Sequence, residues 1–397
     1  MTSVCFYFQV HQPFRLREYN FFQIGEEHNY EYEEKNAFLL NRIAEKCYLP
    51  TNRLLLKLIQ KYKGRFKVCF SISGCAVEQF TSYRPDVLVS FQKLAKTKSV
   101  EFLAETYYHS LSFLFSQKEF VRQVNKHRDK IESLFGKKPQ VFRNTELIYS
   151  NDLAKIVANL GFKGILCEGV DSLLHGRSPS VLYKAKNVEN IKCLLKNYVL
   201  SDDIAFRFSD RSWSEFPLTA EKFAQWVAKQ GNGTVNLFLD YETFGEHQSK
   251  ETGIFAFLEK LPELLLQKEN IDFKTPSELL HDLPVIDEYD VPKPISWADE
   301  ERDLSAWLEN KMQQEAIRRL YSMEAEVLKS HDEQLIETWG RLQTSDHFYY
   351  MSTKYQNDGK VHAYFSPYDS PFDAYINFMN VLSDFEQRLA AKVTLQV

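Results

Sequence analysis

The sequence lacks the short motifs that mark several large enzyme classes. It has no HExxH pair for zinc and no GxSxG turn for a nucleophilic serine. The phosphate-binding loop and the dinucleotide fingerprint are also absent, which argues against a nucleotide enzyme. The net charge is −5 and no long basic run occurs, so nucleic acid is not an expected partner.

Cysteine is scarce, and the six cysteines include no CxxC pair. Several lie inside apolar runs, where a free thiol behaves as a small hydrophobic group. We therefore expect reduced thiols in a cytoplasmic protein. The first residues show no secretory signal, and no apolar run reaches the length of a membrane span. A membrane is therefore not an expected partner.

The composition is that of a soluble globular protein. Hydrophobic residues make up 44% of the 397 positions and charged residues 26%. This length suits a large α/β barrel with an additional domain. Aromatic residues reach 14%, which fits either a ring-rich core or a site that stacks against sugars or bases.

Short apolar runs alternate with helical patterns over most of the chain. Runs such as VCFYFQVH, FKVCFSISG and VNLFLDYE predict buried strands. Helices are expected between them at 50–63, 77–96, 117–134, 150–160 and 219–230. Such alternation predicts parallel strands joined by crossover helices. About seven units fit a barrel related to the eight-unit TIM barrel better than a doubly wound sheet.

Three prolines, Pro284, Pro292 and Pro294, predict a boundary after the barrel. We therefore expect a catalytic barrel over residues 1–285 and a helical region over 286–397. Helices are predicted at 299–342 and at 371–394, the second beginning at Pro371.

Acidic and imidazole side chains follow many of the predicted strands. Active sites of such barrels lie at the carboxyl ends of the strands, so these side chains should meet at one mouth. A single carboxylate there is most often a helix cap or a solvated charge, and Glu246 and His247 keep that ordinary interpretation. The coincidence at several strand ends favours a site formed by His11, Gln12, Glu78, Glu105, His109, Glu146, Asp240 and Glu242.

Two carboxylates facing each other across a barrel mouth can cleave a glycosidic bond. One protonates the leaving oxygen, while the other attacks the sugar or stabilises its cation. Further carboxylates, His and Gln suit sugar hydroxyls, and the rings of Tyr and Trp suit sugar faces. A metal site formed by His11, His109 and Asp240 stays open at this stage, because spacing across strands carries little information.

Five stretches resemble glycoside hydrolase family 57, in its α-amylase-like branch. They occur in the family's order and span nearly the whole chain: HQP at 11–13, GCAVEQF at 74–80, FRNTELIY at 142–149, LDYETFGEHQ at 239–248 and LQTSDHFYYMS at 342–352. The third and fourth are specific. The resemblance implies an incomplete TIM-like (β/α)7 barrel followed by a helical region, and a retaining mechanism on α-glucans.

The resemblance also implies residue roles. It places the nucleophile at Glu146 and the general acid/base at Asp240. We expect no metal and no cofactor, because the sequence has no metal-spaced His or Cys motif and the two-carboxylate mechanism is complete without one. Around the cleaved sugar it places His11, Glu78 and Asp346, with Glu242 beside them. Four further side chains are candidate substrate-binding residues because their imidazole, amide or indole groups suit sugars: Gln12, His109, Trp213 and His347.

The expected activity is that of an α-amylase on α-1,4-glucans or maltooligosaccharides. A 4-α-glucanotransferase or a branching enzyme would use the same site and stays open. From other classes, a metal-dependent polysaccharide deacetylase or mannosidase-type hydrolase and a non-catalytic glycan-binding protein are the alternatives. The sequence does not determine the oligomeric state.

Overall fold

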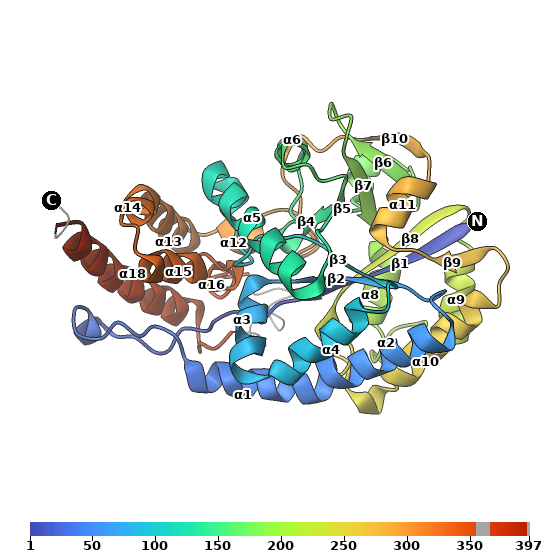
Figure 1. Cartoon of the computed structure of the whole chain (residues 1–397), viewed down its shortest axis with the longest axis horizontal. Coiled ribbons are helices and arrows are strands. Elements are labelled where there is room, and N and C mark those ends of the chain that lie inside the picture. Colours follow the sequence, from blue (N-terminus) through green and yellow to red (C-terminus); the bar gives the residue numbers. More distant parts are fainter. Residues whose placement is uncertain (355–365, 395–397) are drawn as a thin grey trace.

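Seven parallel strands form the centre of the first two thirds of the chain (Figure 1). In this computed structural model, residues 1–354 and 366–394 are described. The seven strands are β1 (Thr2–Val10), β2 (Val68–Ile72), β3 (Val100–Phe102), β4 (Val141–Arg143), β5 (Gly164–Glu168), β7 (Lys192–Lys196) and β8 (Gly233–Asp240).

Hydrogen bonding divides these strands into two sheets that together form a ring. One sheet runs β3-β2-β1-β8, and the other contains β7-β5-β4. A parallel bridge between Ala104 and Phe142 links β3 to β4, and the Asn197 amide donates to the Asn236 carbonyl at 2.9 Å beside β7 and β8. The ring is thin at these two junctions. The expected incomplete (β/α)7 barrel is confirmed.

Three further strands lie outside the ring. β9 (Ile271–Phe273) pairs with the start of β1. β6 (Leu182–Ala185) runs antiparallel to β7, and β10 (Val285–Tyr289) runs parallel to β6. The expected boundary after residue 285 thus falls at the start of a strand that lies beside the barrel.

Helices cover the outer face of the ring (Figure 1). Six were expected in position: α2 (Leu49–Lys61), α3 (Gly74–Tyr83), α4 (Pro85–Ala95), α5 (Gln117–Phe135), α6 (Asn151–Asn159) and α9 (Ala220–Ala228). The stretch 77–96 forms two helices, because Pro85 lacks the N–H that a continuous helix requires. The sequence did not predict α1 (Glu33–Ile43), α7 (Asp171–Leu174), α8 (Tyr198–Ala205), α10 (Ile254–Leu266) and α11 (Pro276–Asp282).

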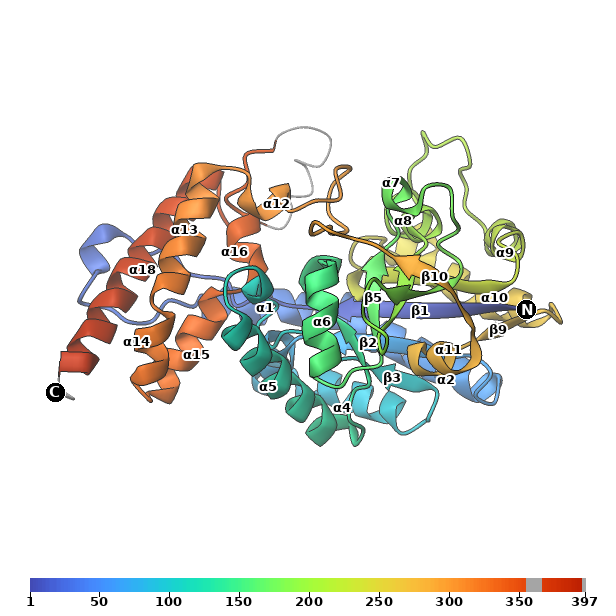
Figure 2. The ribbon, with the colours of Figure 1, turned by 90° about the horizontal axis from the view of Figure 1, so that it is seen from above.

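The C-terminal helices pack against the mouth of the barrel (Figure 2). They are α12 (Ser305–Leu308), α13 (Lys311–Ser322), α14 (Glu324–Lys329), α15 (Glu333–Leu342), α16 (Ser345–Tyr349) and α18 (Pro371–Thr394). Their shared core includes Leu16 and Tyr30 from the segment after β1, and Leu111 and Ile148 from loops after β3 and β4. This core joins the tail to the barrel.

Side-chain alternation in two neighbouring strands determines what faces the interior. In β1, Phe6 and Phe8 belong to the core beneath the outer helices, whereas Cys5 and Tyr7 belong to the interior core. In β8, Leu239 is in the outer core and Phe238 in the interior core. A strand has a side-chain period of two, so residues 9 and 240 face the interior at the mouth.

Candidate active site

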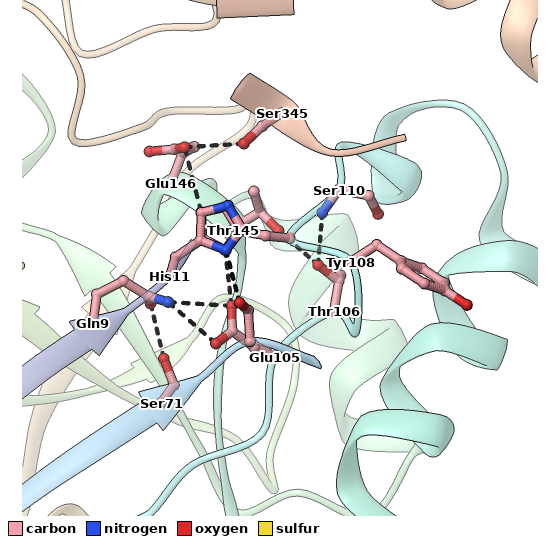
Figure 3. A network of polar contacts seen from close by, with 12 residues as sticks. Gln9, His11, Ser71, Glu105, Thr106, Tyr108, Ser110, Thr145, Glu146 and Ser345 are labelled. Carbon is pink, nitrogen blue, oxygen red and sulfur yellow. Dashed lines mark hydrogen bonds and ion pairs between the residues drawn. The ribbon is translucent and has the colours of Figure 1, made fainter. Parts of the chain in front are cut away.

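Glu146 lies just beyond the end of β4, in a short turn over Thr145–Leu147. Its backbone φ of 56° is in the left-handed region, where a side chain with a Cβ atom is strained by about 1 kcal/mol or more. The Trp297 indole donates to Oε2 at 2.8 Å, and the Ser345 hydroxyl donates to Oε1 at 3.1 Å. Figure 3 shows Ser345 reaching Glu146 from the C-terminal region.

The surroundings of Glu146 favour its ionised form. Burial raises the pKa of this carboxyl group, but the imidazole of His109 and the charge of Arg143 outweigh burial and lower it below the ordinary value. His109 Nε2 lies 3.4 Å from Oε1. A carboxylate that stays ionised near neutral pH can act as a nucleophile.

Asp240 is the last residue of β8, and its surroundings favour the protonated form. Burial, followed by the negative charge of Glu146, raises its pKa from an ordinary 3.8 to about 6. The positive charges of Arg143, His109 and Lys196 limit this rise. Among the described residues, no side chain or amide donates a hydrogen bond to its carboxyl group. Asp240 can therefore hold a proton in the range where a general acid is useful.

Two stacked imidazoles stand beside Glu146. The rings of His11 and His109 are 4.0 Å apart at an angle of 20°. His109 Nδ1 lies 2.8 Å from Glu105, and the carboxylates of Glu105 and Glu146 overcome burial to raise the pKa of His109 to about 9. His109 is therefore a cation at neutral pH.

His11 connects the barrel to the C-terminal region. Its Nδ1 hydrogen-bonds with the Ser73 hydroxyl at 2.7 Å, and its Nε2 lies 3.0 Å from Asp346 on α16. Burial and the cationic His109 lower the pKa of His11 below the ordinary value. Burial opposes ionisation of Asp346, but His11 outweighs it and lowers the pKa of that carboxyl group.

Figure 3 shows the polar layer below these groups, where Gln9 donates to Glu105 at 3.1 Å and accepts from Ser71 at 2.8 Å. This layer fixes the carboxylate that orients His109.

Glu242 lies on the same side of the mouth as Gln12. The run VNLFLDYE was predicted as a strand that includes Glu242, but the strand ends at Asp240 and Glu242 belongs to the turn Tyr241–Thr243. Its carboxyl group accepts from the Tyr48 hydroxyl and from Gln12 at 3.3 Å. Burial and the charge of Asp240 raise the pKa of Glu242 to about 8.

Two contacts hold the carboxylate of Glu78. The Tyr107 hydroxyl and the Arg341 guanidinium each donate to it at 2.8 Å. Arg341 also forms an ion pair with Glu31. The second motif is thereby tied to α15.

Two expected substrate-binding residues do not join this cluster. The Trp213 ring contacts Trp226 at 6.0 Å and lies under Arg207, in the loop between α8 and α9. His347 follows Asp346 on a helix, where one residue turns the side chain by about 100°. It packs against Phe378 of α18, and burial lowers its pKa to about 4. In the fourth motif, the Glu246 carboxylate pairs with Arg42 at 2.5 Å.

The sequence did not reveal several residues of the site. Trp297 lies just after the proline-rich stretch that predicts a domain boundary. Arg143 is inside the third motif but had no expected role, and Ser345 precedes Asp346 in the fifth. Trp297 and Ser345 reach Glu146 from positions far along the chain, for which the sequence gives no local signal. Arg143 is close to Glu146 in the sequence, but nothing in the sequence shows that its side chain is buried beside the carboxylates.

No group of three or more His, Cys, Asp or Glu side chains in the described ranges could hold a metal ion. No helix within those ranges is both long and apolar enough to cross a membrane.

The profile of glycosyl hydrolase family 57 matches residues 5–292. A Methanocaldococcus jannaschii protein provisionally named as an alpha-amylase is 45% identical over 400 residues, which cover 96% of this chain and 84% of that protein. The chain belongs to glycosyl hydrolase family 57, and it is a glycoside hydrolase.

Solved structures share the fold at low sequence identity. The 4-alpha-glucanotransferase of Thermococcus litoralis aligns with a TM-score of 0.66 at 15% identity, covering 87% of this chain and 55% of that one. A family 57 branching enzyme from Thermococcus kodakaraensis aligns with a TM-score of 0.67 at 15% identity, covering 91% and 87%. The barrel and the helical region of this chain therefore belong to a fold that it shares with these two enzymes.

Proposed function

We propose that the protein is a retaining α-amylase that cleaves α-1,4 bonds of glucans and maltooligosaccharides. Membership of family 57 and the 45% identity to a protein provisionally named as an alpha-amylase support the substrate class. One observation carries the assignment of roles. At a shared barrel mouth, the pKa of Glu146 is lowered and that of Asp240 is raised to about 6.

In the first step Glu146 attacks the anomeric carbon while Asp240 gives its proton to the departing glycosidic oxygen. The bond to the leaving sugar breaks as the bond to the Glu146 carboxylate forms. In the second step Asp240 takes a proton from water, and the resulting oxygen displaces Glu146. Two inversions give a product with the α configuration.

The neighbouring groups have supporting roles in this proposal. Cationic His109 keeps Glu146 ionised, and the pair of His11 and Asp346 offers hydrogen-bond partners to the hydroxyls of the bound sugar. Glu242 with Gln12, and Glu78 with Arg341, extend these partners to either side. For Trp213 and His347 the observed packing supports structural roles instead.

Transfer to an acceptor sugar is the second candidate activity, and two specific similarities favour it. The 4-alpha-glucanotransferase and the branching enzyme share the fold. If a sugar hydroxyl replaces water in the second step, the same residues perform transglycosylation. A product profile from maltoheptaose separates the two activities, because hydrolysis gives only shorter chains whereas transfer also gives longer ones.

A metal-dependent deacetylase and a non-catalytic glycan-binding protein are disfavoured by membership of a glycoside hydrolase family. We further propose a cytoplasmic location, supported by six free and buried cysteines. The proposed partner is the glucan substrate. The formal net charge of −5 gives no support for a nucleic-acid partner.

The test is substitution of the proposed nucleophile. Glu146→Gln keeps the shape of the side chain but cannot form the glycosyl-enzyme, so turnover should fall on the order of 10⁴-fold. Glu259→Gln is the matched control, because Glu259 forms an exposed ion pair with Lys57 on the outer helices. In Glu146→Ala, azide should restore bond cleavage and give a glycosyl azide of inverted configuration. Turnover of Glu146→Gln within tenfold of the wild type would refute the assignment.

A further inference from the structure

Arg143, the last residue of β4, is a fully buried arginine with an unusual environment. Its side chain is 0% exposed. None of its three guanidinium nitrogens has a hydrogen-bond acceptor among the residues that the structure describes. Burying a charge without such partners destabilises the folded state strongly, so its retention requires a compensating interaction.

The compensation comes from an aromatic ring and from nearby carboxylates. The guanidinium carbon of Arg143 lies 4.7 Å from the centre of the Trp297 ring, and the ammonium of Lys196 lies 5.5 Å from it. A desolvated cation over an indole ring is attracted by the negative face of the ring. The charge of Arg143 also acts on Glu146, Asp240 and Glu105.

The same indole contacts the proposed nucleophile. Nε1 of Trp297 donates to Glu146 Oε2 at 2.8 Å, and the Trp297 amide donates to the Glu146 carbonyl at 3.1 Å. The cations of Arg143 and Lys196 thus lie over the indole ring, and the N–H group at the edge of the ring donates to the carboxylate of Glu146.

A buried ion cluster fixes the loop that carries Trp297. Arg302 donates to the Trp297 carbonyl at 2.7 Å and lies 3.3 Å from Glu168. Arg302 and Lys196 both pair with Asp202. The backbone of Trp297 is therefore tied to this group of ion pairs, next to the turn that carries Glu146.

We propose that Arg143 is a positioning residue for the reaction: it holds the Trp297 indole against Glu146 and supplies buried positive charge to both carboxylates. This inference rests on the proposed roles of Glu146 and Asp240. The other charged or titratable groups around the two carboxylates and Arg143 are Tyr7, Glu105, His109, Lys196, Glu242 and Asp346.

The test is the pH dependence of kcat/KM on maltoheptaose. In Arg143→Met a cation is lost, so the pKa values of both carboxyl groups rise and both limbs of the profile move to higher pH, by about one unit. Arg143→Lys keeps the charge but loses the planar stack, so its limbs stay in place while kcat falls about tenfold. Arg128→Met is the matched control, because Arg128 lies over the Phe162 ring on an outer helix, 5.8 Å from its centre.

Trp297→Phe tests the contact itself. It keeps a ring for Arg143 but removes the donor to Glu146, so kcat should fall on the order of tenfold or more with KM changed less than about threefold. Unmoved limbs in Arg143→Met, or a wild-type kcat in Trp297→Phe, would overturn the inference. If Arg143→Met does not fold, Arg143→Gln takes its place, and if neither folds the Trp297→Phe result decides.

Failure of this inference differs from failure of the proposed function. If Glu146→Gln is inactive while the pH profile of Arg143→Met has the same limbs as the wild type, only the role of Arg143 is wrong. If Glu146→Gln is active, the proposed nucleophile itself is wrong.

Discussion

Replacement of Asp240 by asparagine should stabilise the protein while it destroys activity. The pKa of Asp240 is raised from 3.8 to about 6, a rise of about two units. Each unit corresponds to about 1.4 kcal/mol, so the ionised carboxyl group destabilises the folded state by about 3 kcal/mol. Asparagine resembles the protonated acid, and no hydrogen-bond donor among the described residues loses its acceptor.

The sign of this effect depends on pH. The pKa of Asp240 is higher in the folded state than in the unfolded state, so the folded state binds the proton more tightly. The stability that this proton gives the wild-type protein is fully present below about pH 3.8 and is lost as the pH rises through about 6. The stability advantage of Asp240→Asn should therefore be close to zero at pH 3.5 and largest at pH 8. Denaturant unfolding of both proteins at the two pH values measures it.

Glu146→Gln is the control of opposite sign. The pKa of Glu146 is lowered, so its charge stabilises the folded state above the unfolded pKa, and that stabilisation is lost as pH falls through the folded pKa. This variant should be less stable than the wild type at pH 8. An Asp240→Asn protein that is less stable at pH 8, or whose advantage is the same at pH 3.5, would refute the reasoning.

Three further predictions concern the edges of the site. Asp346→Asn removes the partner of His11 and should lower kcat on the order of 100-fold with the melting temperature within a few degrees; wild-type kcat would exclude Asp346 from the site. A fragment ending at residue 290 loses the C-terminal core and should be insoluble or inactive; full activity would show that the tail is dispensable. Incubation with a chelator should leave turnover unchanged, and loss that added zinc restores would contradict the two-carboxylate mechanism.

The sequence predicted the barrel because its evidence is local. Apolar runs and helical stripes repeat along the chain, and alternation in β1 and β8 follows from a period of two. That alternation is why Asp240 could be placed at the mouth. Glu242 was predicted inside the strand VNLFLDYE, but the strand ends two residues earlier, at Asp240, and the turn that follows carries no clear sequence signal.

The parts of the site that come from loops could not be predicted in the same way. Trp297 reaches Glu146 across 151 positions, and Ser345 reaches it across 199. Their positions depend on a buried ion cluster and on the packing of α16. His347 was a candidate because an imidazole suits a sugar, but neighbouring side chains on a helix point in different directions, and His347 packs against Phe378.

The proposed mechanism requires that Glu146 becomes covalently bound to the sugar. The most direct measurement is mass spectrometry of peptides from enzyme treated with a 5-fluoroglycosyl fluoride of α-glucose configuration, which forms the intermediate faster than water removes it. We expect one added sugar mass per chain, on the peptide that contains Glu146, and none in Glu146→Gln. A label on another carboxylate, or turnover of the reagent to a β-configured product with no labelled enzyme, would contradict it.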